Sequence, residues 1–112
     1  MEVLDLIQEN QLVVMWRNYI FDIFEKQIAG GKESKTAKRK RDLILKIPHG
    51  QALNLNKILE LDANIFRVYQ GISNRTFLRD LEDLVALKLL KKDGSNYIAN
   101  IGILRTYMAV SR

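Results

Sequence analysis

The chain contains no cysteine, one histidine, His49, and one proline, Pro48. The absence of thiols excludes disulfides and thiolate metal sites, and it fits a reducing compartment. A lone histidine has no companions for a metal cluster, and no serine has a base nearby in the sequence to activate it. We therefore expect no metal site, no cofactor and no enzymatic activity.

Long apolar runs are also missing. The longest unbroken run, from Leu12 to Trp16, is far shorter than the ~20 residues that a membrane-spanning helix needs. The chain does not open with a charged and then apolar leader that ends in a small-residue cleavage site. We expect no membrane partner and a cytoplasmic location.

The composition is that of an ordinary folded domain. The 112 residues include 47% hydrophobic and 28% charged side chains, which is enough apolar material for one modest core. The net charge of +5 favours acidic partners such as nucleic acid.

The most informative stretch covers residues 72–90 and the segment directly behind it. Gly71 supplies the backbone freedom that a sharp turn between helices needs, and Ser73 is a good N-cap. A helix is therefore expected to begin at Asn74. Three apolar residues at three- and four-residue steps form its core-facing stripe: Phe77, Leu81 and Leu84.

The opposite side of this helix has a composition suited to the major groove of DNA. Arginine matches the acceptors of guanine, asparagine matches adenine, and leucine lies well against the methyl group of thymine. Because a helix N-terminus favours phosphate oxygens, we expect Ser73 and Thr76 to hold phosphate there. The residues expected to reach the bases are Asn74, Arg75, Leu78 and Arg79.

A plainer interpretation is a solvated surface helix. In that interpretation Arg75 and Arg79 pair with neighbouring carboxylates on the same helix, as exposed charges commonly do. The available carboxylates are Asp80, Glu82 and Asp83.

A basic hairpin is expected behind the helix. Lys91 and Lys92 precede the turn residues 93–96, and apolar runs lie on both sides of them. This pattern predicts two short strands joined by a tight turn. We expect the two lysines to neutralise backbone phosphates beside the helix.

The stretch RTFLRDLEDLVALKLLKKDG resembles the winged helix-turn-helix domains of many bacterial transcription factors. In that family the turn is often Gly-Val-Ser, and here it is Gly71-Ile72-Ser73. The segment 57–70 is longer than the family's usual single helix before the turn, and Lys88 stands where a glycine is common. The resemblance implies a recognition helix, a wing and double-stranded DNA as partner.

A looser resemblance covers the whole chain. A tryptophan-bearing helix, a basic linker and a terminal winged helix are similar to the tail behind the catalytic domain of some Fic-family proteins. That family is implied to transfer AMP through a histidine-led loop, and no such loop exists around His49. The alternative function is therefore a non-catalytic interaction or dimerisation segment of a larger Fic-type protein.

Residues 1–29 hold no proline or glycine and predict one long amphipathic helix. Its middle is apolar nearly all round, so it needs cover on several sides. The cover is either a second copy of the chain, a domain of a longer parent protein, or simply the core of this domain. Apolar residues repeat every seven positions along this helix, as in paired helices, although Asn10 and Arg17 interrupt the second apolar row that such pairing needs. The side chains expected to form a symmetric dimer are Ile7, Val14, Trp16, Phe21, Phe24 and Ile28.

Residues 30–41 are interpreted as a basic linker. Four consecutive cations in it are expected to attract phosphates, although such a run is also typical of a merely solvated segment: Lys38, Arg39, Lys40 and Arg41. The winged helix domain is then expected to cover residues 42–112. Within it we expect a short strand in residues 51–56 and a helix capped by Asn56, and residues 57–70 form either one bent helix or two.

These observations predict a mainly α fold with a small β-hairpin wing, in which a winged helix-turn-helix follows a long N-terminal helix. The predicted function is that of a DNA-binding, transcription-regulator-like module.

Overall fold

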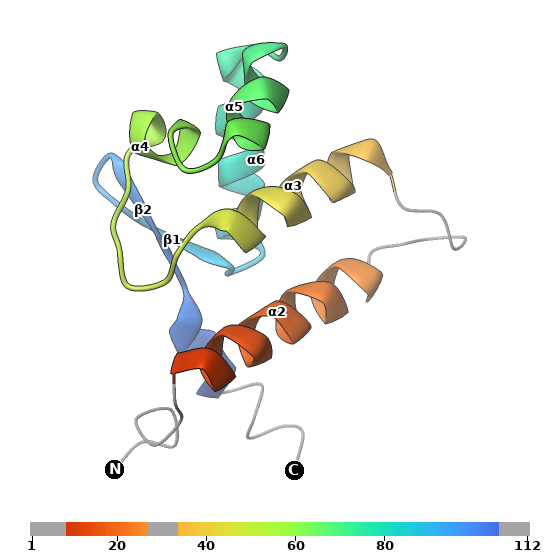
Figure 1. Cartoon of the computed structure of the whole chain (residues 1–112), viewed down its shortest axis with the longest axis vertical. Helices are drawn as coiled ribbons and strands as arrows, with labels where there is room; N and C mark the ends of the chain where they lie inside the picture. The colour runs from red at the N-terminus through yellow and green to blue at the C-terminus, as the bar shows by residue number, and fades with distance from the viewer. Residues whose placement is uncertain (1–8, 27–33, 106–112) are drawn as a thin grey trace.

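The computed structural model describes residues 9–26 and 34–105. Five helices, a two-stranded hairpin and a short 3-10 helix follow one another in the described residues (Figure 1). In chain order they are α2 (Glu9–Lys26), α3 (Lys35–Lys46), α4 (Leu55–Leu59), α5 (Ala63–Gln70), α6 (Asn74–Ala86), β1 (Leu90–Asp93), β2 (Asn96–Ala99) and η2 (Ile101–Ile103). The expected fold class, mainly α with a small β-hairpin, is confirmed.

Helices α2 and α3 lie side by side and run in opposite directions, and α3 also packs against α6 (Figure 1). One face of α2 enters the core through Trp16, Ile20 and Phe24. The expectation that Trp16 and Phe24 form a dimer interface is therefore wrong, because α3 and the rest of the domain already cover both rings. Of the other residues expected in that interface, Ile7 and Ile28 lie outside the described residues.

Helix α3 begins earlier than the sequence indicated. Ser34 is its N-cap, and the Ser34 hydroxyl accepts a hydrogen bond of 3.0 Å from the backbone N–H of Ala37. The assignment of residues 35–41 to a linker is thus wrong, since they form the first two turns of a helix. Lysine and arginine are good helix formers, and Leu43 and Ile44 bury the inner face of the same helix.

The segment before the turn forms two helices rather than one bent helix. Asn54, not Asn56, caps α4 by accepting from the backbone N–H of Lys57 at 2.9 Å. Asp62 caps α5 by accepting from the N–H of Asn64 at 2.8 Å. This second cap lowers the pKa of Asp62, because the backbone hydrogen bond favours the charged carboxylate.

Helix α6 begins where the sequence predicted. The Ser73 side chain accepts from the N–H of Thr76 at 3.2 Å and caps the helix. The predicted stripe is confirmed, because Phe77, Leu81 and Leu84 are all buried. Burial of this stripe leaves the opposite side of α6 directed outward.

The hairpin pairs Leu90 with Ala99 at its base and Asp93 with Asn96 beside the turn. Gly94 has a φ of +61°, a conformation that glycine adopts without steric cost. Leu53 forms an isolated bridge with Tyr97 through two backbone hydrogen bonds of 2.8 Å, in the segment where a short strand was expected. The hairpin is thereby tied to the helical part of the domain.

Lys88 has a φ of +65°, the left-handed conformation that a non-glycine residue adopts only at a cost. Glycine would adopt this conformation without steric cost. Replacing Lys88 with glycine is expected to raise the free energy of unfolding by about 0.5–1 kcal/mol, because released strain exceeds the added freedom of the unfolded chain. Urea unfolding followed by circular dichroism measures this difference.

A matched control is Lys57→Gly, which places glycine in the regular backbone of α4. It should destabilise the protein by up to ~1 kcal/mol. A loss of stability for Lys88→Gly as well would show that the lysine side chain contributes more than its backbone conformation costs.

Candidate nucleic-acid interface

The outward face of α6 brings together the side chains expected to read bases. They all lie on the first two turns of the helix and are exposed to solvent: Asn74, Arg75, Leu78 and Arg79. Leu78 remains 40% exposed although it is a large apolar side chain. The face therefore combines two guanidinium groups, an amide and an exposed methyl-bearing surface.

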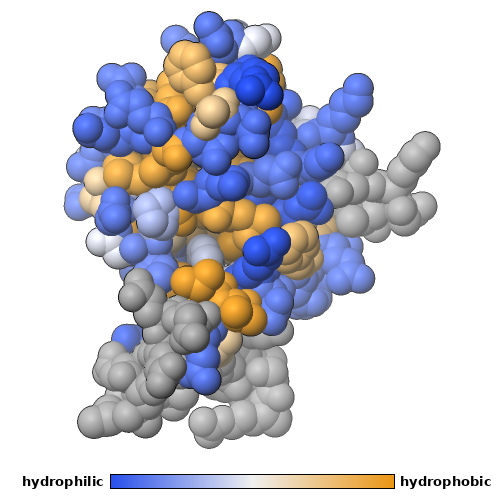
Figure 2. All heavy atoms as spheres, in the orientation of Figure 1, coloured by the Kyte–Doolittle hydropathy of each residue, from blue (hydrophilic) through white to orange (hydrophobic). Residues whose placement is uncertain are grey.

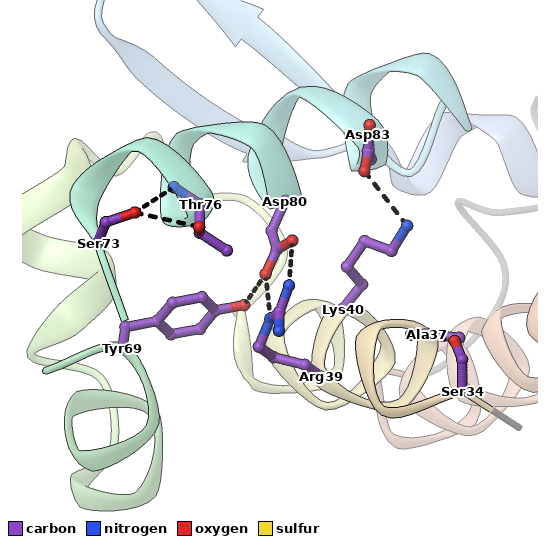
Figure 3. A network of polar contacts seen from close by, with 9 residues as sticks. All are labelled: Ser34, Ala37, Arg39, Lys40, Tyr69, Ser73, Thr76, Asp80 and Asp83. Carbon is purple, nitrogen blue, oxygen red and sulfur yellow. Dashed lines mark hydrogen bonds and ion pairs between the residues drawn. The ribbon is translucent and has the colours of Figure 1, made fainter. Parts of the chain in front are cut away.

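Asp80 lies on the same helix but points into the domain, where it is 1% exposed (Figure 3). Its carboxylate accepts two hydrogen bonds from Arg39 of α3, at 2.6 Å from Nε and 2.9 Å from Nη2. The Tyr69 hydroxyl of α5 donates a third at 2.7 Å. Asp80 thus joins three helices and does not neutralise the outer arginines.

The other two carboxylates of α6 also have partners outside the helix. Asp83 lies 3.3 Å from Nζ of Lys40 on α3 (Figure 3). Glu82 lies 3.3 Å from Nζ of Lys92 on the hairpin. The plainer interpretation, in which Arg75 and Arg79 pair with carboxylates of the same helix, therefore does not agree with the structure.

Arg75 and Arg79 form no ion pair with a carboxylate within residues 9–26 and 34–105. Each acidic side chain next to them in the helix is already occupied by a cation from another element. Two uncompensated positive charges are therefore exposed one turn apart on the same face.

Contacts inside the network shift the pKa of two of its members, Arg39 and Tyr69. The hydrogen bond from Arg39 to Asp80 raises the pKa of the guanidinium above its usual value. Burial, followed by the hydrogen bond to Asp80, raises the pKa of the Tyr69 hydroxyl far above its ordinary range. The Tyr69 hydroxyl therefore stays protonated and donates its hydrogen bond to Asp80.

The residues interpreted as a linker hold four cations that were expected to bind phosphate. Three of these cations contact other side chains of the domain. Arg39 is held by Asp80 and Lys40 by Asp83, while the guanidinium of Arg41 lies 5.2 Å from the centre of the Phe21 ring. We therefore withdraw these three from the candidate interface. Lys38 is exposed and makes no ion pair with any described residue, and it lines a groove between α2, α3 and α5.

The hairpin contributes two exposed lysines, as predicted. Lys91 makes no ion pair in the described part of the chain. Lys92 pairs with Glu82, and this hydrogen bond is the main cause of the raised pKa of Lys92. Because both partners are about half exposed, the pair is weak and a phosphate can replace Glu82.

Ser73 and Thr76 lie at the start of α6, where phosphate was expected. The Ser73 hydroxyl serves as the helix cap, and it lies 3.1 Å from the Thr76 hydroxyl (Figure 3). The two hydroxyls thus hold each other and the first turn of the helix in place.

Sequence reasoning missed the role of Asp80. Its signal was nevertheless present, because Asp80 follows Phe77 by three residues and precedes Leu84 by four, which places a carboxylate on the core-facing stripe. A charged side chain in that position requires a buried partner. Only the fold identifies the partner as Arg39, which is 41 residues away in the sequence.

Other kinds of site are not evident in the described residues. They contain no group of three or more histidine, cysteine, aspartate or glutamate side chains that could hold a metal ion. None of their helices combines the length and apolar character needed to cross a membrane. In comparisons with known proteins, no family model, curated protein or solved structure matches this chain.

Proposed function

We propose that the chain is a DNA-binding module of the winged helix-turn-helix class, and that it acts in transcription regulation in the cytoplasm. The observation that carries the proposal is the pair of uncompensated guanidinium groups, Arg75 and Arg79, on the exposed side of α6. A helix that directs free arginines outward suits both the charge and the hydrogen-bond pattern of the major groove.

The other elements support this face. The N-terminal half of α6 enters the major groove, where Arg75, Arg79 and Asn74 contact base edges and Leu78 contacts thymine methyl groups. Lys91 and Lys92 of the hairpin neutralise backbone phosphates beside it. Ser73 and Thr76 orient the helix start towards a further phosphate.

Arg79→Ala tests this division of roles. The substitution should reduce discrimination between the preferred duplex and random duplex by ~1–3 kcal/mol, because a base contact is lost. The preferred duplex is first obtained by selection from a random pool, and both affinities are then measured by fluorescence anisotropy.

Lys91→Ala is the matched control on the hairpin. It removes a phosphate contact and should weaken binding to both duplexes by the same factor. If Arg79→Ala also weakens both duplexes equally, Arg79 contacts backbone and not bases.

A second candidate function is protein contact through α2, as in a homodimer or the non-catalytic tail of a Fic-type protein. The favouring observation is that Val14 and Phe21, two of the residues expected in a dimer, are 55% and 38% exposed on one side of α2. The guanidinium groups of Arg17 and Arg41 lie over the Phe21 ring, at 5.8 and 5.2 Å from its centre. These two charged groups reduce the apolar surface that α2 can offer to a partner. Protein contact through α2 therefore ranks below DNA binding.

A further inference from the structure

A groove of about 690 Å³ lies between α2, α3 and α5. This volume falls within the range of about 300–1,000 Å³ that is common for small-molecule sites. Hydrophobic atoms lie exposed among hydrophilic ones across the middle of the face in Figure 2. Six apolar side chains line the groove: Val13, Trp16, Leu43, Leu45, Ile65 and Val68.

Two of these apolar side chains are exposed to solvent. Val13 of α2 and Val68 of α5 are 47% and 45% exposed, and both face this one hollow from opposite helices. Apolar side chains that converge on a concave surface favour an apolar occupant.

The rim of the groove carries a surplus of positive charge. Lys46 and Asp62 line it and pair with each other at 3.5 Å, and Asp42 pairs with Arg41 at the same distance. Lys35 and Lys38 also line the groove, and neither forms an ion pair with a described residue. Two ammonium groups are thus available to an anion at the edge of an apolar hollow.

We propose that this groove binds a small amphipathic carboxylate. Its hydrocarbon body lies against Val13, Trp16 and Val68, and its carboxylate lies between Lys35 and Lys38. The free ammonium groups distinguish this ligand from an uncharged apolar molecule of the same shape.

The groove also touches the network that positions α6. Arg39 and Tyr69 both line it, and both bind Asp80. An occupant of the groove therefore contacts the side chains that fix the recognition helix, so binding here and binding of DNA are coupled. This coupling rests on the proposed function, whereas the binding itself is measured without DNA.

Trp16 makes binding directly observable, because it is the only tryptophan in the chain and lines the groove. Decanoate, kept below the concentration at which it aggregates, should change Trp16 fluorescence in a saturable manner. Lys35→Ala combined with Lys38→Ala should weaken this binding by roughly tenfold or more, because two charge-assisted contacts are lost. Decanol, the uncharged analogue, should bind the wild-type protein and the double variant equally weakly.

Lys57→Ala is the control, since Lys57 is exposed on α4 and is not part of the groove. It should leave decanoate affinity unchanged, and circular dichroism should show that every variant is folded. Val68→Asp should abolish binding by placing a carboxylate in the apolar wall.

Several outcomes would overturn the proposal. These are absence of saturable binding, equal affinity for decanoate and decanol, and decanoate affinity that is unaffected by the lysine double variant or by Val68→Asp. A chain that sediments as a dimer, becomes monomeric on Val68→Asp and does not bind decanoate would show instead that the groove holds a second copy. A positive decanoate result without DNA binding would leave the site in place and refute only the coupling.

Discussion

Replacing Asp80 with alanine is expected to lower the free energy of unfolding by about 3–5 kcal/mol, the usual cost of removing one partner from a buried ion pair. The Asp80 carboxylate is 1% exposed and accepts three hydrogen bonds, two from Arg39 and one from Tyr69. Without it, the part-buried Arg39 guanidinium and the buried Tyr69 hydroxyl lose their shared acceptor. Because domains of this size are stable by only about 5–15 kcal/mol, the variant should lie close to unfolding at ambient temperature.

Urea unfolding followed by circular dichroism measures this loss, and Asp83→Ala is the matched control. Asp83 is on the same helix and also pairs with a cation of α3, but its side chain is 44% exposed. Its removal should cost less than about 1 kcal/mol. Similar losses for the two variants would contradict the assignment of Asp80 as the residue that joins α3, α5 and α6.

A double-mutant cycle isolates the ion pair itself. Arg39→Ala combined with Asp80→Ala should cost clearly less than the sum of the two single substitutions, because the double variant leaves no charge buried alone. Additive losses would mean that Arg39 and Asp80 stabilise the domain independently of each other.

Helix α6 could be predicted because its determinants are local. Ser73 caps a helix whose apolar residues repeat at helical spacing, so the start of α6 and the burial of Phe77, Leu81 and Leu84 follow from the sequence alone. The hairpin was predictable for the same reason, since its turn residues lie directly between two apolar runs.

The basic segment could not be interpreted locally. Lys38, Arg39, Lys40 and Arg41 look alike in sequence, yet one faces a groove, one holds a buried carboxylate, one pairs with Asp83 and one covers a ring. These differences arise from contacts with elements far away in the chain, above all α6. A run of cations therefore predicts attraction to phosphate only for the members that the fold leaves unpaired.

The same limit applies to α2. Its nearly uniform apolar composition showed that several sides need cover, but not which side chains the domain covers itself. The structure places Trp16, Ile20 and Phe24 in the core and leaves Val14 and Phe21 exposed. A heptad spacing alone could not separate these two groups.

Binding to random duplex DNA should be strongly salt-dependent. On random duplex, where Arg75 and Arg79 find no matching bases, these arginines can contact phosphates in addition to those held by Lys91, Lys92 and the start of α6, so roughly three to five phosphates are neutralised. Each neutralised phosphate releases condensed counterions, so log affinity should fall with log salt at a slope of roughly −3 to −5. Between about 50 and about 200 mM salt, affinity should therefore fall by roughly 10² to 10³-fold.

Charge reversal of the two arginines should remove this binding. In Arg75→Glu combined with Arg79→Glu, carboxylates on the exposed side of α6 would face the phosphates and repel them. Neither arginine has a carboxylate partner in the described residues, so the fold should be retained. Lys26→Glu is the control, because Lys26 is an exposed cation at the end of α2.

The most direct measurement is a fluorescence anisotropy titration of labelled random duplex at two salt concentrations, with the wild-type chain, the arginine double reversal and Lys26→Glu. The wild-type chain and Lys26→Glu should bind with the steep salt dependence given above, and the double reversal should not bind at the lower salt concentration. Absence of wild-type binding at low salt, a slope near zero, or full retention of binding by the double reversal would contradict the claim that Arg75 and Arg79 form a DNA-binding face.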